Sequence, residues 1–161
     1  MNVTFTFKNF PKSKDELQNI PEISLDTPFK AAALTALVFL NYEHDVNKTI
    51  EMLNVLKGPK PLSNYDISFI KDRISDKPYV IKSYFEGTSP SNNYEYNSPL
   101  KITVYDNKYS YDNEGYAKLY IQSSGADSQR PIVLREKDGK WYLWENLLLA
   151  DIRKPANLSG W

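Results

Sequence analysis

Residues 31–40 are apolar at every position except Thr35. They follow Thr27, a residue type that can cap a helix, and Pro28, which suits the first helical position. The pattern predicts a helix over residues 29–42 that is apolar on most of its circumference. Such a helix must be buried on more than one side, so the rest of the chain has to cover it.

The length of the chain fits one domain built around this helix. Its 161 residues fall within the usual range of about 100–200 residues per domain. The apolar run is about half of the ~20 residues that a membrane-spanning helix needs. The first residues also lack the basic and apolar regions of a signal peptide. We therefore expect a cytoplasmic protein.

Two further helices are predicted after the central one. Residues 46–57 place apolar side chains at helical spacing, Asp45 can cap their start, and a Gly-Pro pair follows their end. The third helix begins at Ser63, which has the spacing of a capping box with Asp66. Together, the three helices make residues 26–77 the helical half of the chain.

The N-terminal segment, residues 1–25, is predicted to hold one strand and a connecting arm. Residues 3–7 alternate apolar and polar side chains with period two, which is typical of a half-buried strand. Residues 11–23 carry charges and two prolines without a sustained period. This composition favours an arm that runs over the surface.

After residue 78 the hydrophobic period changes to two, which predicts strands. An Asp-Gly pair at residues 138–139 separates two of these strands and is a strong hairpin signal. Short links between successive strands favour antiparallel neighbours, and residues 87–99 form a longer polar loop. The predicted strands cover residues 79–85, 100–105, 116–123, 132–137 and 141–144.

These elements predict one α+β domain over residues 1–161, in which helices cover the concave face of a curved antiparallel sheet of four to six strands. The strands occupy residues 78–146, and a tail follows at 147–161. This order of elements, with the hairpin at residues 134–143, is similar to the cone-shaped folds related to nuclear transport factor 2. The resemblance implies a cone-like sheet around a small pocket.

A second resemblance covers roughly the last quarter of the chain. The segment SSGADSQRPIVLR at residues 123–135 continues to WYLWE at residues 141–145. This pattern resembles the C-terminal signature of a family of small uncharacterised bacterial proteins. The family has no assigned activity, so the resemblance implies no role for any residue.

The composition excludes several classes of function. Without cysteine the chain cannot form disulfides, thiolate zinc sites, iron–sulfur centres or a cysteine nucleophile. Because 20 Lys and Arg balance 20 Asp and Glu, net charge gives no reason to expect nucleic acid or a membrane surface as partner. No nucleophile elbow or glycine-rich phosphate loop is present, so no cofactor is expected. His44, the single histidine, follows a predicted helix, and we expect it at the surface rather than as a base or metal ligand.

The most informative polar stretch is the loop over residues 123–130. Gly125 permits a positive φ, and Asp127 belongs to a residue type that bonds neighbouring backbone. In one interpretation the turn presents Arg130 and Arg135 to an anionic ligand or partner. In the other, which we favour, Asp127 and Arg130 pair locally and fix the link between two strands.

Aromatic side chains are concentrated in the strand half. Seven of the 12 tyrosines lie between residues 94 and 120, where they could finish a core edge, line a pocket or anchor an interface. Trp141 and Trp144 fall on opposite faces of one predicted strand. Both can be buried only if a helix, the C-terminal tail or a second subunit covers the outer face, and a homodimer is one of these three arrangements.

The sequence therefore predicts a non-enzymatic domain that binds a small molecule or a protein partner and that forms a homodimer. The alternative is a small-pocket enzyme of the nuclear-transport-factor-2-like kind that uses carboxylate and tyrosine side chains. We predict no catalytic residue and no metal ligand. The candidate binding residues are Tyr120, Asp127, Arg130, Arg135 and Trp144.

Overall fold

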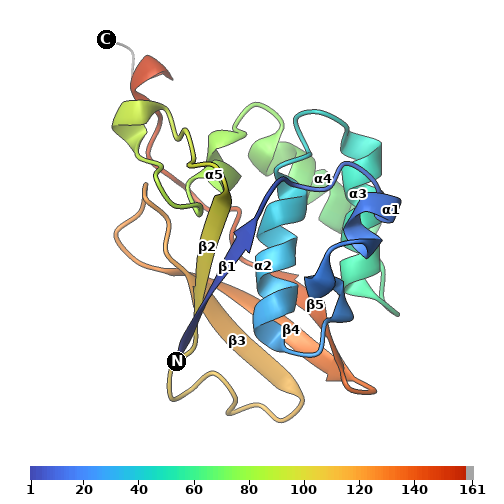
Figure 1. Cartoon of the computed structure of the whole chain (residues 1–161). Coiled ribbons are helices and arrows are strands. Elements are labelled where there is room, and N and C mark those ends of the chain that lie inside the picture. Colours follow the sequence, from blue (N-terminus) through green and yellow to red (C-terminus); the bar gives the residue numbers. More distant parts are fainter. Residues whose placement is uncertain (159–161) are drawn as a thin grey trace.

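A computed structural model describes residues 1–158, and these form a mixed α/β fold in which the helices gather on one side of an antiparallel sheet (Figure 1). The strand order β1-β2-β3-β4-β5 follows the chain, so the predicted meander and the predicted number of strands are confirmed. The sheet does not close on itself, because β1 and β5 are its two edges. The strands are β1 (Asn2–Phe7), β2 (Leu100–Tyr105), β3 (Tyr116–Ile121), β4 (Arg130–Lys137) and β5 (Lys140–Asn146).

The three predicted helices are present, and side chains cap their N-termini as expected. Thr27 accepts a hydrogen bond from the Lys30 amide, and Asp45 accepts one from the Lys48 amide. Ser63 and Asp66 form the reciprocal capping box. The helices are α1 (Lys14–Gln18), α2 (Pro28–Phe39), α3 (Val46–Lys57), α4 (Asn64–Ile74) and α5 (Tyr79–Lys82), with 3-10 turns η1 (Pro21–Ser24), η2 (Pro90–Asn92) and η3 (Ala156–Leu158).

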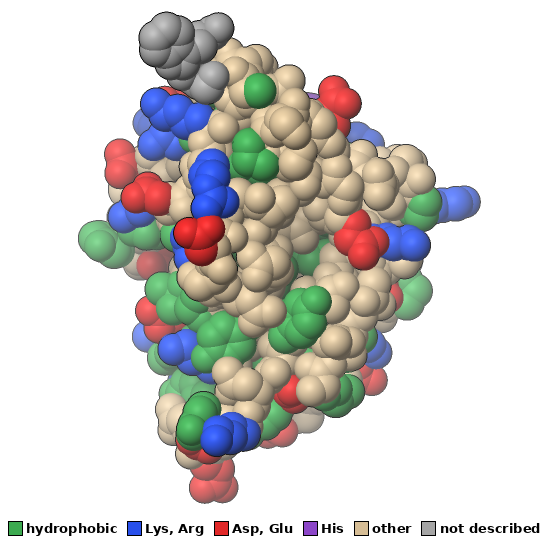
Figure 2. All heavy atoms as spheres, turned by 90° about the vertical axis from the view of Figure 1, so that its left-hand side faces the viewer, with side chains coloured by type: hydrophobic (Ala, Val, Ile, Leu, Met, Phe, Trp, Pro, Cys, Tyr) green, Lys and Arg blue, Asp and Glu red, His purple; other side chains and the backbone are tan. Residues whose placement is uncertain are grey.

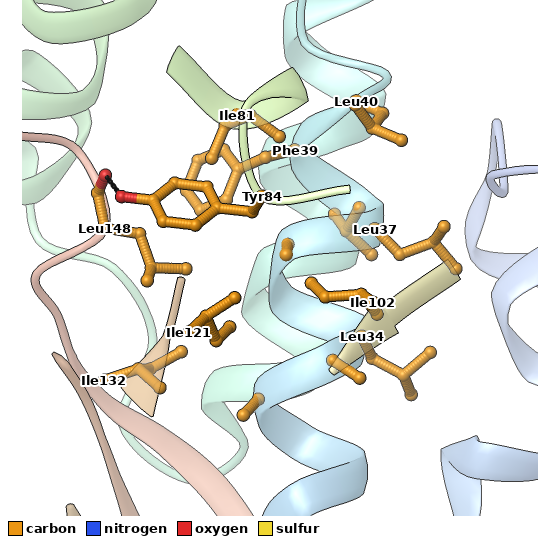
Figure 3. Packing of buried hydrophobic residues seen from close by; sticks show 14 of the residues in the cluster. Leu34, Leu37, Phe39, Leu40, Ile81, Tyr84, Ile102, Ile121, Ile132 and Leu148 are labelled. Atoms are coloured by element: carbon orange, nitrogen blue, oxygen red, sulfur yellow. Dashed lines mark hydrogen bonds between the residues drawn. The ribbon is translucent and has the colours of Figure 1, made fainter. Parts of the chain in front are cut away.

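Helix α2 is the centre of the core, as its sequence predicts. All its residues from Ala31 to Phe39 are buried, and the helix contacts β2, β3, β4 and β5. Figure 3 shows Leu34 and Leu37 of α2 beside Ile102 of β2. The one polar residue in the run, Thr35, donates its hydroxyl to the Ala31 carbonyl at 2.8 Å, which satisfies it inside the core.

The predicted strand at residues 79–85 is wrong, because this segment forms the short helix α5 and a following turn. Every residue from Tyr79 to Phe85 is buried except Lys82, which is half-buried. A segment buried on every side shows the same run of apolar residues whether it is helix or strand. The place beside β2 is taken by β1, which pairs with it from Asn2↔Tyr105 to Phe7↔Leu100.

The predicted surface arm at residues 11–23 is also more ordered than expected. It contains helix α1, whose N-cap Ser13 accepts a hydrogen bond from the Glu16 amide, and the turn η1. Leu17 of α1 is completely buried and fixes the arm to the core. A sequence pattern could not reveal this helix. It has five residues and only one of them is buried, so its apolar residues do not repeat at helical spacing.

Tyr84 connects α5 to the C-terminal segment. Its hydroxyl donates a hydrogen bond of 2.5 Å to the Leu148 carbonyl, drawn as a dashed line in Figure 3. Burial raises the pKa of Tyr84 above its ordinary value, with a small opposing effect from Arg130. The fold therefore stabilises the neutral phenol.

We expect replacement of Tyr84 by phenylalanine to weaken the dependence of stability on alkaline pH. Below about pH 10 the phenol is neutral in both states, but above it the unfolded chain loses this proton and the folded chain keeps it. The free energy of unfolding of the unmodified protein should therefore fall as pH rises through this range, and less steeply in the variant. At neutral pH the variant should lose about 1–3 kcal/mol, because the Leu148 carbonyl is left unpaired.

Urea unfolding of both proteins between about pH 8 and 11 measures this difference. Tyr65→Phe is the matched control, since the Tyr65 side chain is 77% exposed. The pKa values of Tyr79, Tyr94 and Tyr111 are also raised, mainly by burial, so part of the slope should persist in the variant. Equal slopes for Tyr84→Phe and the unmodified chain would contradict the prediction.

Candidate functional site

Trp144 lies at an irregularity of the edge strand β5. Leu134 faces Leu143 and Val133 faces Glu145, so Trp144 is an extra residue in a β-bulge. Trp141 packs against the core cluster, whereas the ring of Trp144 contacts Tyr116 edge-on at a centroid distance of 5.8 Å. The bulge therefore turns the Trp144 indole outward at the margin of the sheet.

Two cationic side chains lie over the Trp144 indole. The Lys60 ammonium is 4.9 Å from the ring centroid, and the Arg135 guanidinium is 4.8 Å from it. Arg135 also lies 5.5 Å from the ring centroid of Tyr116. These distances are within the range of cation–π attraction, so the aromatic rings hold the two cations in place without neutralising them.

A third cation, Lys57, approaches Trp144 from the end of α3. It is half-buried, and its ammonium donates a hydrogen bond of 3.2 Å to the Trp144 carbonyl. Burial lowers the pKa of Lys57, Lys60 lowers it further, and Asp66 opposes both effects. An ammonium in this position would gain from an anion close by.

Gly58 brings this turn against the sheet. Its φ is +67°, and a Cβ at this position would lie 2.4 Å from Cδ1 of the Tyr142 ring. Only glycine permits both the backbone conformation and the close approach. The tight contact with Tyr142 places Lys57 and Lys60 on either side of the turn, next to Trp144.

The surface between the turn and the hairpin forms a cavity of about 300 Å³, which we call the basic groove. Glu136 is the one acidic side chain that lines it. Within residues 1–158 the ion pairs involve the N-terminus, Lys30, His44, Lys82 and Arg153, and none involves a cation of this groove. The basic groove is lined by Lys57, Lys60, Arg135, Lys137, Tyr142 and Trp144, with Pro59, Leu143 and Glu136.

A second cavity of about 250 Å³ adjoins it between α3, α4 and the end of β5, and we call it the apolar groove. The two grooves share Lys57, Leu143 and Trp144 as lining residues. Polar side chains of Asp66, Glu145 and Asn146 also border the apolar groove. Its apolar lining consists of Phe39, Leu53, Leu62, Phe69, Ile70, Leu143 and Leu147.

The face of the molecule shown in Figure 2 carries charges of both signs. Figure 2 views the left-hand side of Figure 1, where hydrophobic side chains form separate patches with Lys or Arg and Asp or Glu between them. Such a mixed surface is normal for a globular domain. The basic groove differs from it by its group of unpaired cations.

The predicted pair between Asp127 and Arg130 is wrong. Asp127 pairs instead with Arg153 of the C-terminal segment. The Arg130 guanidinium donates to the Ser128 hydroxyl at 2.9 Å and to the Asp151 carbonyl at 3.2 Å, while its Nε is buried without a partner. Both residues fix the C-terminal segment, and the guanidinium of Arg130 is already engaged there.

Gly125 has a role other than the predicted one. Its φ is not positive. A Cβ at this position would lie 2.2 Å from the Tyr94 hydroxyl oxygen and 2.5 Å from Cγ2 of Ile152. Glycine is needed here for close packing, because the Tyr94 hydroxyl passes beside it to donate to the Arg153 carbonyl at 2.5 Å.

The structure thus brings together only two of the five candidate residues, Arg135 and Trp144. Tyr120 lies opposite Pro131 between β3 and β4, half-buried and away from the basic groove. His44 is 58% exposed and stacks on Phe10 at 5.6 Å. Within residues 1–158, no three His, Cys, Asp or Glu side chains are grouped so that they could hold a metal ion.

The other members of the basic groove were missed in the sequence. Lys57, Lys60, Lys137 and Tyr142 each look like ordinary solvated residues in their own segments. One signal was available, since the Gly-Pro pair after α3 marks a sharp turn with lysines on both sides. Nothing local indicates that this turn packs on β5.

The fold and the site define a mixed α/β domain with an open, helix-covered antiparallel sheet and a basic, aromatic groove at the sheet margin. The chain belongs to the family described as domain of unknown function DUF6935, whose model matches residues 9–156. No curated protein and no solved structure matches the chain significantly. Within the described residues, no helix has the length and apolar character needed to cross a membrane.

This membership agrees with the expected uncharacterised family. Two points stay predictions. One is that the C-terminal pattern is a signature of this family, and the other is the likeness to nuclear-transport-factor-2-like folds.

Proposed function

We propose that the domain is a non-enzymatic binding module that takes up a small anionic ligand in the basic groove. The observation that carries this proposal is the group of four cations, Lys57, Lys60, Arg135 and Lys137, that line one groove without an ion pair to any described carboxylate. Like charges held close together repel one another, and a bound anion would relieve that repulsion.

The chemistry of the lining suits a carboxylate or phosphate group. Arg135 offers a planar set of donors that can bind two oxygens at once, and lysine ammonium groups add point charges. Trp144 and Tyr142 supply rigid walls that lose little conformational entropy on binding. Because the rings already hold Lys60 and Arg135, part of the ordering cost is met before a ligand arrives.

Inorganic pyrophosphate is a suitable first probe, with binding measured by calorimetry and by tryptophan fluorescence. We expect saturable binding at low salt that weakens as salt is added, since screening reduces attraction between exposed charges. The double variant Lys60→Gln/Arg135→Gln should bind at least about tenfold more weakly, because two charge-assisted contacts are lost.

The matched control removes two exposed lysines elsewhere, Lys8→Gln/Lys101→Gln, and leaves the net charge equal to that of the test variant. If both double variants lose affinity equally, binding depends on overall charge and the basic groove is not the site. Absence of saturable binding to any anion would overturn the proposed function.

The enzymatic alternative has less support. It needs an enclosed pocket with a carboxylate inside the sheet, but α2 fills that side with buried apolar residues. No Asp or Glu side chain is buried among residues 1–158. The proposal keeps three expectations from the sequence: a bacterial origin, a cytoplasmic location and a homodimer.

A further inference from the structure

The two grooves adjoin each other, and the residues at their shared border differ in chemistry. Lys57, Leu143 and Trp144 line both cavities, so the apolar groove borders the basic groove at these three residues. The Lys57 ammonium lies at this junction, where its hydrogen-bond partner is the Trp144 carbonyl. A molecule that occupies both grooves would therefore lie beside Lys57.

We propose that the ligand is an amphipathic anion, with an alkyl chain in the apolar groove and a carboxylate on the cations around Trp144. The inference rests on the proposed function and names its ligand class: a medium-chain fatty acid. Charge complementarity sets the orientation of this occupant. The basic groove is lined by Lys57, Lys60 and Arg135, so the carboxylate belongs there. The apolar groove carries Asp66 and Glu145 beside Lys57, so it suits the uncharged alkyl chain.

Each alternative occupant satisfies only half of the site. A neutral apolar molecule would desolvate the end of Lys57 without pairing its charge, which is costly. An anion without an alkyl chain would leave Leu62, Phe69 and Leu147 of the apolar groove in contact with water. Together the adjoining cavities have the size expected for a small-molecule site, which is about 300–1,000 Å³.

The environment of the Lys57 ammonium supports the same orientation of the ligand, with its carboxylate toward the basic groove. This ammonium is half-buried, and this burial lowers its pKa although the nearby Asp66 opposes the effect. In the apolar surroundings of the junction, attraction between an ammonium and a carboxylate is stronger than in open water. The carboxylate should therefore lie nearest to Lys57, while Lys60 and Arg135 border its outer side.

The test is a titration of the full chain with straight-chain carboxylates below their micelle concentrations. Calorimetry gives the affinity and stoichiometry, and tryptophan fluorescence reports on Trp144, with Trp144→Phe as the control for the other tryptophans. We expect one decanoate per chain and an affinity that rises about two- to fourfold for each added methylene until the apolar groove is full. Decanol, which has the same chain without the charge, should bind at least about tenfold more weakly.

Two variants separate the chain contact from the charge contact. Leu147→Asn, at a residue 38% exposed on the apolar groove, should reduce decanoate affinity and leave pyrophosphate affinity unchanged. Lys57→Met keeps the length of the stem and removes the charge, so it should reduce affinity for both probes. Leu158→Asn, at a residue 54% exposed in η3, is the matched control and should change neither.

The outcomes distinguish the inference from the proposed function. If pyrophosphate binds but affinity does not depend on chain length, or Leu147→Asn has no effect, the fatty-acid inference is overturned and anion binding stands. If decanol binds as tightly as decanoate, the charged head has no role and the inference is again overturned. If neither anion binds, both are overturned.

Discussion

Replacing Leu37 with alanine is expected to lower the free energy of unfolding by about 2–5 kcal/mol, the range for a fully buried leucine. Leu37 is completely buried in α2, and Figure 3 shows it among the side chains of the cluster, near Ile102 of β2. The loss combines the transfer energy of the removed methyl groups with the cavity that they leave behind. Because α2 touches four of the five strands, little of that cavity can collapse.

Chemical denaturation of the two proteins measures this loss directly. Leu158→Ala makes the same chemical change at an exposed position and should stay within about 0.5 kcal/mol of the unmodified protein. A similarly small loss for Leu37→Ala would show that α2 is not the centre of the core.

The second large effect is expected for Gly58→Ala, which should destabilise the protein by about 2–4 kcal/mol. The positive φ contributes strain of roughly 1–3 kcal/mol for a residue with a side chain. The new methyl group would also overlap the Tyr142 ring, and overpacking typically costs about 1–3 kcal/mol. The turn should move away from β5 and take Lys57 and Lys60 with it, so anion affinity should fall as well.

Gly115→Ala is the matched control for this variant. Gly115 has a φ of +82°, but a Cβ there would meet no atom within 4 Å. It therefore reports the cost of backbone strain alone, while Gly58→Ala reports strain plus contact with Tyr142. Equal losses in the two variants would show that the turn does not press on the sheet.

Local signals account for the parts of the fold that the sequence predicts well. The capping residues Thr27, Asp45 and Ser63 act on amides within three residues of themselves, so they identify helix starts without any tertiary information. The Asp-Gly turn works in the same way, and both of its residues adopt positive φ in the hairpin. Alternation of apolar residues gives the buried face of β3 correctly.

Where tertiary contacts decide the conformation, sequence patterns are insufficient. Residues 79–85 form a helix and a turn in which all residues but Lys82 are buried, and their apolar run fits a strand equally well. The single buried residue of α1, Leu17, gives no period at all.

The same distinction between local signals and tertiary contacts applies to the residues of the candidate site. Arg135 and Trp144 come from one hairpin, so their proximity follows from the turn between them. Lys57 and Lys60 come from the helical half and reach Trp144 only because the Gly58 turn packs on Tyr142. Asp127 and Arg130 could not be assigned, since their partners Arg153 and Asp151 lie in a segment without a regular pattern.

The position of α2 in the chain has a consequence for synthesis. The helix ends at Phe39, but the strands that cover it begin at Leu100 and finish at Asn146. At about 5–20 residues per second, translation leaves several seconds between the appearance of this apolar helix and the arrival of its sheet. Strand β1 also lacks its partner during this interval, because β2 lies about a hundred residues later in the chain. Until the last hairpin has left the ribosome, the apolar surface of α2 therefore stays without its sheet, which is the condition under which incompletely folded chains tend to aggregate.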